Sequence, residues 1–255
     1  MTGLQNTLAL ILVVIAFVLM ILFTFLKPLQ GRITLRPMAA FRRLRRALGL
    51  AAEDGKRVHV TLGKSSLLGV EGATALVGLA VLERIAQLSV ISDRPPTVTS
   101  GDGALSLLSQ DTLRAAYRTS NALEQYDSDQ ARLTGTQPMA YVVGTLPVIH
   151  DEQVATTVLL GNFGPEAAFL CEASDQERSF TLAASDSLPA QAVFYATAEE
   201  PLIGEELFAV PAYLQAGPAH MASLRVQDIL RWVVIGGLLV TAVLKLANEM
   251  FGVRF

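Results

Sequence analysis

The sequence feature that most constrains this chain is a run of uncharged residues near its N-terminus, residues 8–26. It holds nineteen residues, of which only Thr24 is polar, and Lys27 ends it. As a helix it would extend about 28 Å, close to the roughly 30 Å hydrocarbon thickness of a bilayer, and a helix satisfies its own backbone there. We therefore predict a transmembrane helix within residues 1–26.

The alternative for this run is a cleaved secretory signal. Such a signal has a positively charged N-terminal region and a small-residue cleavage site. Residues 1–7 carry no charged side chain, and residues 27–29 (Lys-Pro-Leu) provide no such site. Retention in the membrane is therefore the favoured interpretation.

A basic linker follows the run, at residues 27–57. Nine Lys and Arg residues stand there against Glu53 and Asp54, and such an excess beside a span favours the cytoplasmic side. Apolar residues at helical spacing in 37–50 predict an amphipathic helix in the headgroup layer, with a solvated linker as the alternative. The residues assigned to the anionic membrane surface are Arg42, Arg43, Arg45 and Arg46. Without interleaved aromatics they do not predict a nucleic-acid partner.

A second apolar run begins at Trp232 and is interrupted by Lys245 and Glu249. Extended over residues 232–251 it reaches twenty residues, with Lys245 snorkelling to the headgroups or pairing with Glu249. We predict a second transmembrane helix within 223–255, with a buried or interfacial helix as the alternative. Two spans would place the intervening domain, residues 58–222, in the cytoplasm.

The intervening domain has the length of one ordinary α/β domain. Over residues 61–222 it carries seven basic residues against nineteen Asp and Glu. Repulsion from anionic headgroups should hold such a domain off the lipid bilayer except at its basic linker. Cys171 is the sole cysteine of the chain, which excludes an intrachain disulfide and a Cys-based zinc site.

The domain alternates between two kinds of pattern. Short apolar or β-branched runs predict strands at 58–62, 97–99, 131–136, 154–160, 180–184 and 192–196. Helical spacing predicts helices at 73–88, 105–123, 167–173 and 199–214, and a further one from 137 to 146 that Gly144 and Pro147 argue against. The alternation predicts an α/β fold: a Rossmann-like three-layer domain with a parallel sheet, inserted between the N- and C-terminal transmembrane helices.

Ligands of an open parallel sheet bind at the carboxyl ends of its strands, which nominates loops 63–66, 99–103, 161–166 and 197–200. The candidate ligand-binding residues are Thr99, Ser100, Gly101, Asp102, Gly161, Asn162, Phe163, Gly164 and Glu166. The glycines of 161–164 precede a helix N-terminus, where free N–H groups bind anions, although glycines also serve simply to make a turn. For Asp102 the favoured interpretation is a cap for the helix that follows it.

Catalytic signatures are few. Gly63-Lys64-Ser65 matches only the end of a phosphate-binding P-loop, because Val58 stands where the motif needs its first glycine. The three histidines lie far apart and without metal-ligand spacing. No G-x-S-x-G nucleophile motif is present. The sequence therefore predicts no metal site, leaves any cofactor unassigned, and leans against an enzyme.

Three segments carry a resemblance to a known family. They are 95–102 (PPTVTSGD), 161–166 (GNFGPE) and 202–208 (LIGEELF). Through them the chain from about 58 to 232 resembles an uncharacterised family of bacterial two-span membrane proteins with a Rossmann-like cytoplasmic domain. The resemblance implies a membrane location and a domain boundary, and it implies no activity.

Together these features favour a non-enzymatic, membrane-anchored scaffold that assembles with itself, as a homo-oligomer, or with a neighbouring membrane protein. Gly236 and Gly237 would allow close approach of helices in the second span. One alternative is a cytoplasmic-facing ligand sensor or nucleotide-binding module that uses the strand-end loops. A further alternative is a membrane-bound hydrolase acting through Ser100 or Asp102.

Overall fold

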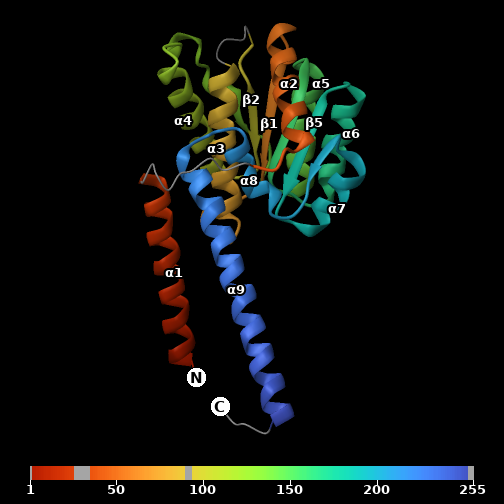
Figure 1. Ribbon diagram of the computed structural model, residues 1–255. Helices are drawn as coiled ribbons and strands as arrows, with labels where there is room; N and C mark the ends of the chain where they lie inside the picture. The colour runs from red at the N-terminus through yellow and green to blue at the C-terminus, as the bar shows by residue number, and fades with distance from the viewer. Residues whose placement is uncertain (1, 26–34, 90–93, 252–255) are drawn as a thin grey trace. The chain divides into compact units, whose positions relative to one another are not determined.

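The computed structural model describes residues 2–25, 35–89 and 94–251, which form two compact units. The first unit joins the two ends of the chain, Met1–Leu35 and Gly217–Phe255. The second unit is Arg36–Ala216 and contains the sheet. Figure 1 shows the elements of both.

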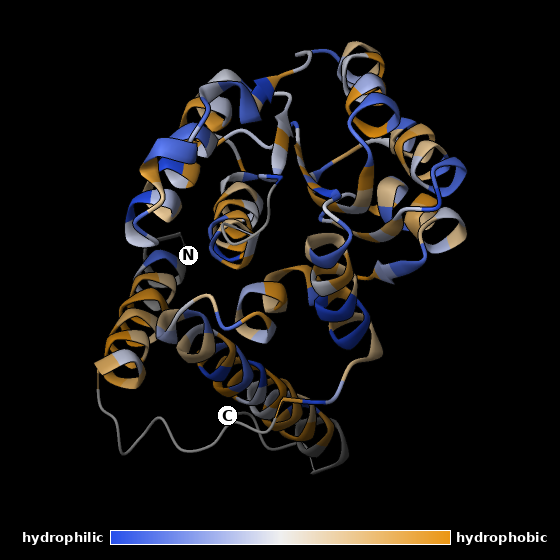
Figure 2. Ribbon diagram, turned by 90° about the horizontal axis from the view of Figure 1, so that it is seen from above, coloured by the Kyte–Doolittle hydropathy of each residue, from blue (hydrophilic) through white to orange (hydrophobic). Residues whose placement is uncertain are grey.

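The first unit consists of two long helices that contact each other, α1 (Thr2–Phe25) and α9 (Pro218–Phe251). Within the described residues one helix is long and apolar enough to cross a membrane, the stretch Pro218–Leu246 of α9. The apolar part of α1, Ala9–Phe25, is shorter. The C-terminal helix is therefore the stronger candidate for a membrane span, although the N-terminal run has fewer charged residues. The reason is that α9 begins at Pro218 and not near Trp232. Figure 2 colours the helices by hydropathy, and hydrophobic residues are frequent in both.

The second unit is built on a six-stranded sheet in which every neighbouring pair is parallel. Its strands are β1 (Arg57–Gly63), β2 (Thr97–Ser100), β3 (Ala131–Leu133), β4 (Val154–Asn162), β5 (Phe180–Ser185) and β6 (Glu200–Leu202). Their order is β3-β2-β1-β4-β5-β6, the Rossmann order, which changes direction between β1 and β4. The predicted α/β class and parallel sheet are confirmed.

Helices cover both faces of this sheet (Figure 1). One hydrophobic cluster joins it to α2 (Ala39–Glu53), α3 (Gly72–Ser89), α4 (Gly103–Thr119) and α8 (Glu206–Tyr213). A second joins it to α5 (Pro138–Asp151), α6 (Ala168–Gln176) and α7 (Leu188–Thr197). Strands buried by helices on both sides need apolar or threonine-rich sequences, which β4 supplies.

Helix α2 belongs to the core of this unit. Its apolar residues Phe41, Leu44 and Leu48 are at most 7% exposed and pack in the first cluster. The domain therefore begins before residue 58, where the sequence analysis placed its boundary. The apolar side of the helix packs on the sheet, which offers it an apolar partner within the chain.

The sequence analysis was wrong about the segment after β5. Residues 192–196 were predicted as a strand from their aromatic and β-branched content, but they lie in α7. Pro189 stands in the first turn of that helix, and Ala190 and Phe194 bury one side of it at helical spacing. The last strand is β6, inside the predicted helix 199–214, so loop 197–200 follows a helix and not a strand.

Helix α5 forms despite Gly144 and Pro147. Gly144 is needed there, because a Cβ atom on it would lie 2.3 Å from the carbonyl oxygen of Thr134. The helix crosses from β3 to β4 and so carries the chain over the change of strand order. A residue that argued against the helix from sequence thus permits its close packing.

Candidate functional site

The change of strand order between β1 and β4 brings two of the predicted loops together. A Cβ atom on Gly161 would lie 2.0 Å from the carbonyl oxygen of Leu62. A Cβ atom on Gly63, whose φ is +62°, would lie 2.3 Å from the carbonyl oxygen of Asn162. These glycines are therefore required by the close approach of two strand ends, whether or not a ligand binds.

The N–H groups proposed to bind an anion are already used by the chain itself. Those of residues 162, 163 and 164 donate to three side chains that lie at the strand ends or shortly after them. The acceptors are Ser65 Oγ at 2.7 Å, Ser185 Oγ at 3.3 Å and Glu166 Oε1 at 3.2 Å. Three successive donors are thus satisfied without any bound group.

Glu166 occupies the position of an anion at this point. Its side chain is 13% exposed, and its Oε1 lies 3.9 Å from Lys64 Nζ. Its Oε2 lies close to Gly164: a Cβ atom added to this glycine would be only 2.2 Å from it. The carboxylate therefore supplies the negative charge that a phosphate would otherwise bring to the lysine and the loop N–H groups.

Asp186 completes the closure and was missed by the sequence analysis. Its Oδ1 accepts a hydrogen bond from Asn162 Nδ2 at 2.9 Å, and its Oδ2 accepts one from Thr74 Oγ1 at 2.8 Å. It follows β5 directly, and Ser65 stands two residues after the end of β1. Position after a buried parallel strand was the available signal, but residue type alone did not separate these side chains from ordinary loop residues.

The loop after β2 serves the helix that it precedes. Asp102 Oδ1 accepts from Leu105 N at 2.9 Å and so caps α4. Ser100 is 1% exposed and donates to the Asp102 carbonyl oxygen at 3.4 Å. Gly101 N donates to the Gly63 carbonyl oxygen at 2.8 Å. The capping interpretation is confirmed, and a buried serine held in this way is not presented to a substrate.

A buried polar cluster lies beneath these loops. His59 Nε2 is 2.9 Å from Thr99 Oγ1, while its Nδ1 has no hydrogen-bond partner among the described residues. Tyr141 OH lies within hydrogen-bonding distance of Thr61 Oγ1 and accepts from Gly63 N at 3.3 Å. Burial lowers the pKa of His59 to about 4 and raises that of Tyr141. Both side chains are therefore neutral at pH 7 and sealed from solvent.

Glu152 anchors the other end of this cluster. Arg57 Nη1 donates to it at 2.8 Å and Thr97 Oγ1 at 2.9 Å, and Arg132 also pairs with it. Partial burial raises the pKa of Glu152, but the Arg132 and Thr97 hydrogen bonds and the two positive charges outweigh it and lower the pKa overall. The carboxylate ties α5 to β1, β2 and β3.

The four arginines assigned to the membrane surface are divided between the two sides of α2. Arg43 pairs with Glu200, and Arg45 donates to the carbonyl oxygen of Tyr213 at 2.6 Å. The other two make no hydrogen bond or ion pair with any residue the structure describes. Two of the four therefore hold elements of the domain together.

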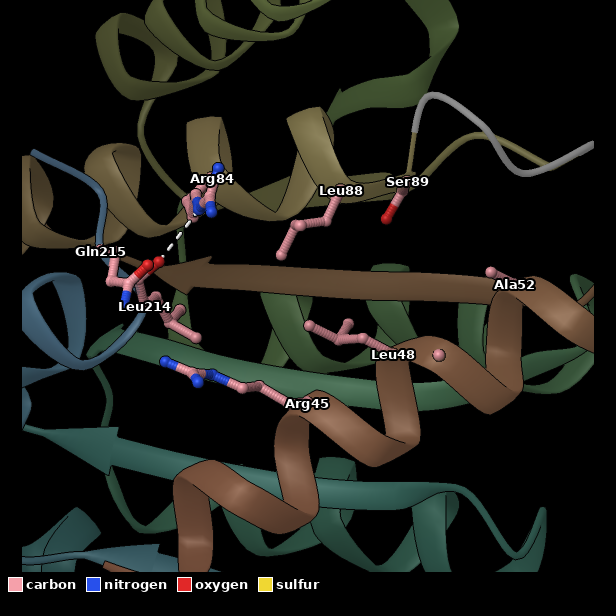
Figure 3. Close-up of a pocket in the computed structure, with 9 residues that line it drawn as sticks. Arg45, Leu48, Ala52, Arg84, Leu88, Ser89, Leu214 and Gln215 are labelled. Carbon is pink, nitrogen blue, oxygen red and sulfur yellow. Dashed lines mark hydrogen bonds between the residues drawn. The ribbon is translucent and has the colours of Figure 1, made fainter. Parts of the chain in front are cut away.

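A cavity flanks α2 on each side. One, of about 460 Å³, is lined by Arg43, Arg46, Lys56 and Arg178 but also by Asp54 and Glu199. The other, of about 380 Å³, lies between α2 and α3 and is lined, within the part of the chain that the structure describes, by two arginines and no carboxylate (Figure 3). No group of three or more His, Cys, Asp or Glu placed to hold a metal occurs in 2–25, 35–89 or 94–251.

This fold and these loops define a class: an α/β domain of Rossmann strand order whose ligand-binding edge is closed by its own side chains. The chain belongs to the family described as "Domain of unknown function (DUF6754)", whose model matches residues 3–254. The match confirms membership of an uncharacterised family, while its bacterial and two-span character stays a prediction. No curated protein and no solved structure gave a match.

Proposed function

We propose that this protein is a membrane-anchored, non-catalytic module that assembles with copies of itself or with a neighbouring membrane protein. One observation carries the proposal. At the edge where Rossmann-type domains bind ligands, three successive backbone donors are satisfied by side chains of the chain itself, and the Glu166 carboxylate lies 3.9 Å from Lys64 Nζ. A domain closed in this way is suited to present its outer surface to a partner.

The anchoring part of the proposal rests on α9 and α1. The stretch Pro218–Leu246 has the length and apolarity of a membrane span, and α1 adds a second, shorter apolar helix that contacts it. Both would cross the membrane, and the basic residues of 27–57 favour a cytoplasmic position for Arg36–Ala216. The same proposal includes contact of Arg42 and Arg46 of α2 with anionic headgroups.

The native mass of the full chain tests the assembly. In nanodiscs or mild detergent we expect a homo-oligomer or a stoichiometric complex with another membrane protein. A monomer that co-purifies with nothing from native membranes would contradict it. Reporter fusions after residues 120 and 255 test the topology, since two spans place 120 in the cytoplasm and 255 outside.

A nucleotide-binding module is the second candidate, and the strand order favours it, because the β1–β4 edge is where dinucleotides bind in this fold. Binding would require the Glu166 carboxylate to leave Gly164 N and Lys64. A thermal-shift screen of the full chain with nucleotides tests it, since a ligand at a hundred times its dissociation constant adds about 2.7 kcal/mol of stability. Absence of any shift would leave the first proposal standing.

A further inference from the structure

The cavity between α2 and α3 has an unusual distribution of charge. Its lining, drawn in Figure 3, is Arg45, Leu48, Gly49, Ala52, Arg84, Leu88, Ser89, Leu214 and Gln215. The volume of about 380 Å³ is within the range of small-molecule sites. Among the described residues, two cations and three leucines with no Asp or Glu make a wall that is apolar and positively charged.

The two arginines converge on neighbouring backbone atoms. Arg45 Nη2 donates to the carbonyl oxygen of Tyr213 at 2.6 Å, and Arg84 Nε donates to that of Leu214 at 2.9 Å. Adjacent carbonyl groups hold both guanidinium groups at one end of the cavity, as Figure 3 shows. Neither pairs with a carboxylate within the described residues. Two like charges are therefore held together where the partial negative charge of the α8 C-terminus offsets only part of their repulsion.

Hydrogen-bond donors remain at this end. A guanidinium has five N–H groups. Arg45 uses one nitrogen, and Arg84 uses Nε and the Nη1 that donates to Gln87 Oε1 at 3.3 Å. The remaining N–H groups of both side chains have no acceptor in the described parts of the chain. They are charged donors, on an exposed Arg45 and a part-buried Arg84, of the kind that binds a carboxylate or a phosphate.

The rest of the wall is suited to an apolar group. Leu48 and Leu88 project toward each other from α2 and α3 in Figure 3, and Leu214 lies beside the arginines. Ser89, 6% exposed, lies beyond the leucines. The cavity on the other side of α2 differs in that Asp54 and Glu199 line it, so its cations have counter-charges nearby.

We propose that the cavity between α2 and α3 binds a small amphiphilic anion, with its carboxylate or phosphate on Arg45 and Arg84 and its short apolar group between Leu48 and Leu88. The occupant is a free small molecule and not a bilayer lipid, because the cavity is lined only by residues of Arg36–Ala216 and is of small-molecule size. The site is separate from the β1–β4 edge and does not depend on the assembly proposed above.

Gly49 allows the test to leave every hydrogen bond intact. It lines the cavity from α2, and a Cβ atom on it would meet nothing within 4 Å. Gly49→Leu therefore adds a bulky group to the cavity wall without removing a charge, and Gly49→Ala is its matched control. Arg45→Gln removes one of the two cations, and Arg46→Gln removes the neighbouring cation that faces the other cavity.

The experiment is calorimetric titration of the full chain, in nanodiscs of zwitterionic lipid, with hexanoate, hexanol and acetate, after subtraction of empty nanodiscs. We expect saturable binding of hexanoate, and binding at least about tenfold weaker for hexanol and acetate, which lack the charge or the apolar group. Gly49→Leu and Arg45→Gln should each weaken hexanoate binding about tenfold or more. Gly49→Ala and Arg46→Gln should leave it within about twofold of the wild type.

Two results would overturn the proposal. One is hexanoate binding that is absent, or that responds equally to both Gly49 variants. The other is a stabilisation of the chain by anionic lipid included in its nanodisc that Gly49→Leu removes, while free hexanoate does not bind. This result would assign the cavity to a lipid headgroup. Neither result bears on the oligomeric state, so this proposal and the assembly proposal fail independently.

Discussion

The β1–β4 edge and the cavity between α2 and α3 are two regions of one domain that differ in whether their polar groups have partners within the chain. At the edge, three successive N–H groups donate to Ser65, Ser185 and Glu166, and the Glu166 carboxylate also lies 3.9 Å from Lys64 Nζ. In the cavity, Arg45 and Arg84 keep N–H groups that nothing in the described chain accepts. Topology thus nominates a site, but the hydrogen bonds left unused decide whether a ligand has anything to bind.

The largest expected effect tests how tightly the edge is closed. Gly161→Ala would bring a methyl group within 2.0 Å of the Leu62 carbonyl oxygen, which forces two backbone segments apart. We expect a loss of at least about 3 kcal/mol in the free energy of unfolding. Unfolding of the full chain in nanodiscs, with hydrogen exchange at β1 and β4, measures it.

Gly103→Ala is the matched control, because it lies in the first turn of the nearby helix α4 and its Cβ would meet nothing within 4 Å. It should change stability by less than about 1 kcal/mol. Equal losses in both variants would show that the edge is not closely packed.

The buried His59 below the edge predicts a pH dependence of similar size. Burial lowers its pKa from 6.5 to about 4 in the folded domain, with Glu152 raising it and Arg132 lowering it by smaller amounts. Above pH 6.5 both states are neutral; as the pH falls toward 4, only the unfolded chain takes up the proton, so stability falls. The shift corresponds to about 3 kcal/mol.

His59→Gln removes this titration and keeps a group able to hydrogen-bond to Thr99. The difference in stability between wild type and variant, measured from pH 8 to pH 4, should change by about 3 kcal/mol, in favour of the variant at low pH. A difference that stays constant over this range would mean that His59 is not sealed from solvent.

An intermediate effect is expected from a substitution that opens the β1–β4 edge to an anion. Glu166→Ala removes the acceptor of Gly164 N and the carboxylate near Lys64. We expect about 1 kcal/mol less stability and a new stabilisation by inorganic phosphate, measured by thermal shift. Glu172→Ala, on α6 away from the edge, is the control. A phosphate response in the wild type as strong as in Glu166→Ala would abolish the contrast between the two regions.

The smallest expected effect concerns Gly49, in the wall of the cavity between α2 and α3. Gly49 lies inside α2, where glycine costs backbone entropy and a Cβ would meet open space. Gly49→Ala should therefore raise stability by about 0.5–1 kcal/mol. Chemical unfolding measures the gain, with Gly55→Ala as the comparison, since Gly55 has a φ of +62° and should lose stability. Destabilisation by Gly49→Ala would indicate that the cavity is less open than described.

Much of the fold was readable from the sequence. The runs at 58–62, 97–99, 154–160 and 180–184 lie in β1, β2, β4 and β5, because buried parallel strands must be apolar and β-branched over a short length. The prediction of a strand at 192–196 was wrong, since a short apolar run suits a strand or a buried helix equally, and Pro189 stands in the first turn of the helix α7.

The position of the candidate site was predicted from the sequence, but its closure by side chains of the chain itself was not. Residues 99–102 and 161–166 do lie at strand ends, and the capping role of Asp102 was foreseen. The closure by Ser65, Ser185 and Asp186 was not, because these residues meet Asn162 and its neighbours only across the sheet. The arginines of α2 were expected at a lipid surface, since nothing in sequence shows that Arg45 reaches Tyr213.

The sequence by itself determined the class of fold and the presence of an apolar helix at each end, because periodicity and length are local properties of a chain. Only the tertiary structure decided which polar groups meet. Strand order places β1 beside β4 and α2 beside α3, and those neighbours, far apart along the chain, settle which donors are satisfied and which are left open to a ligand.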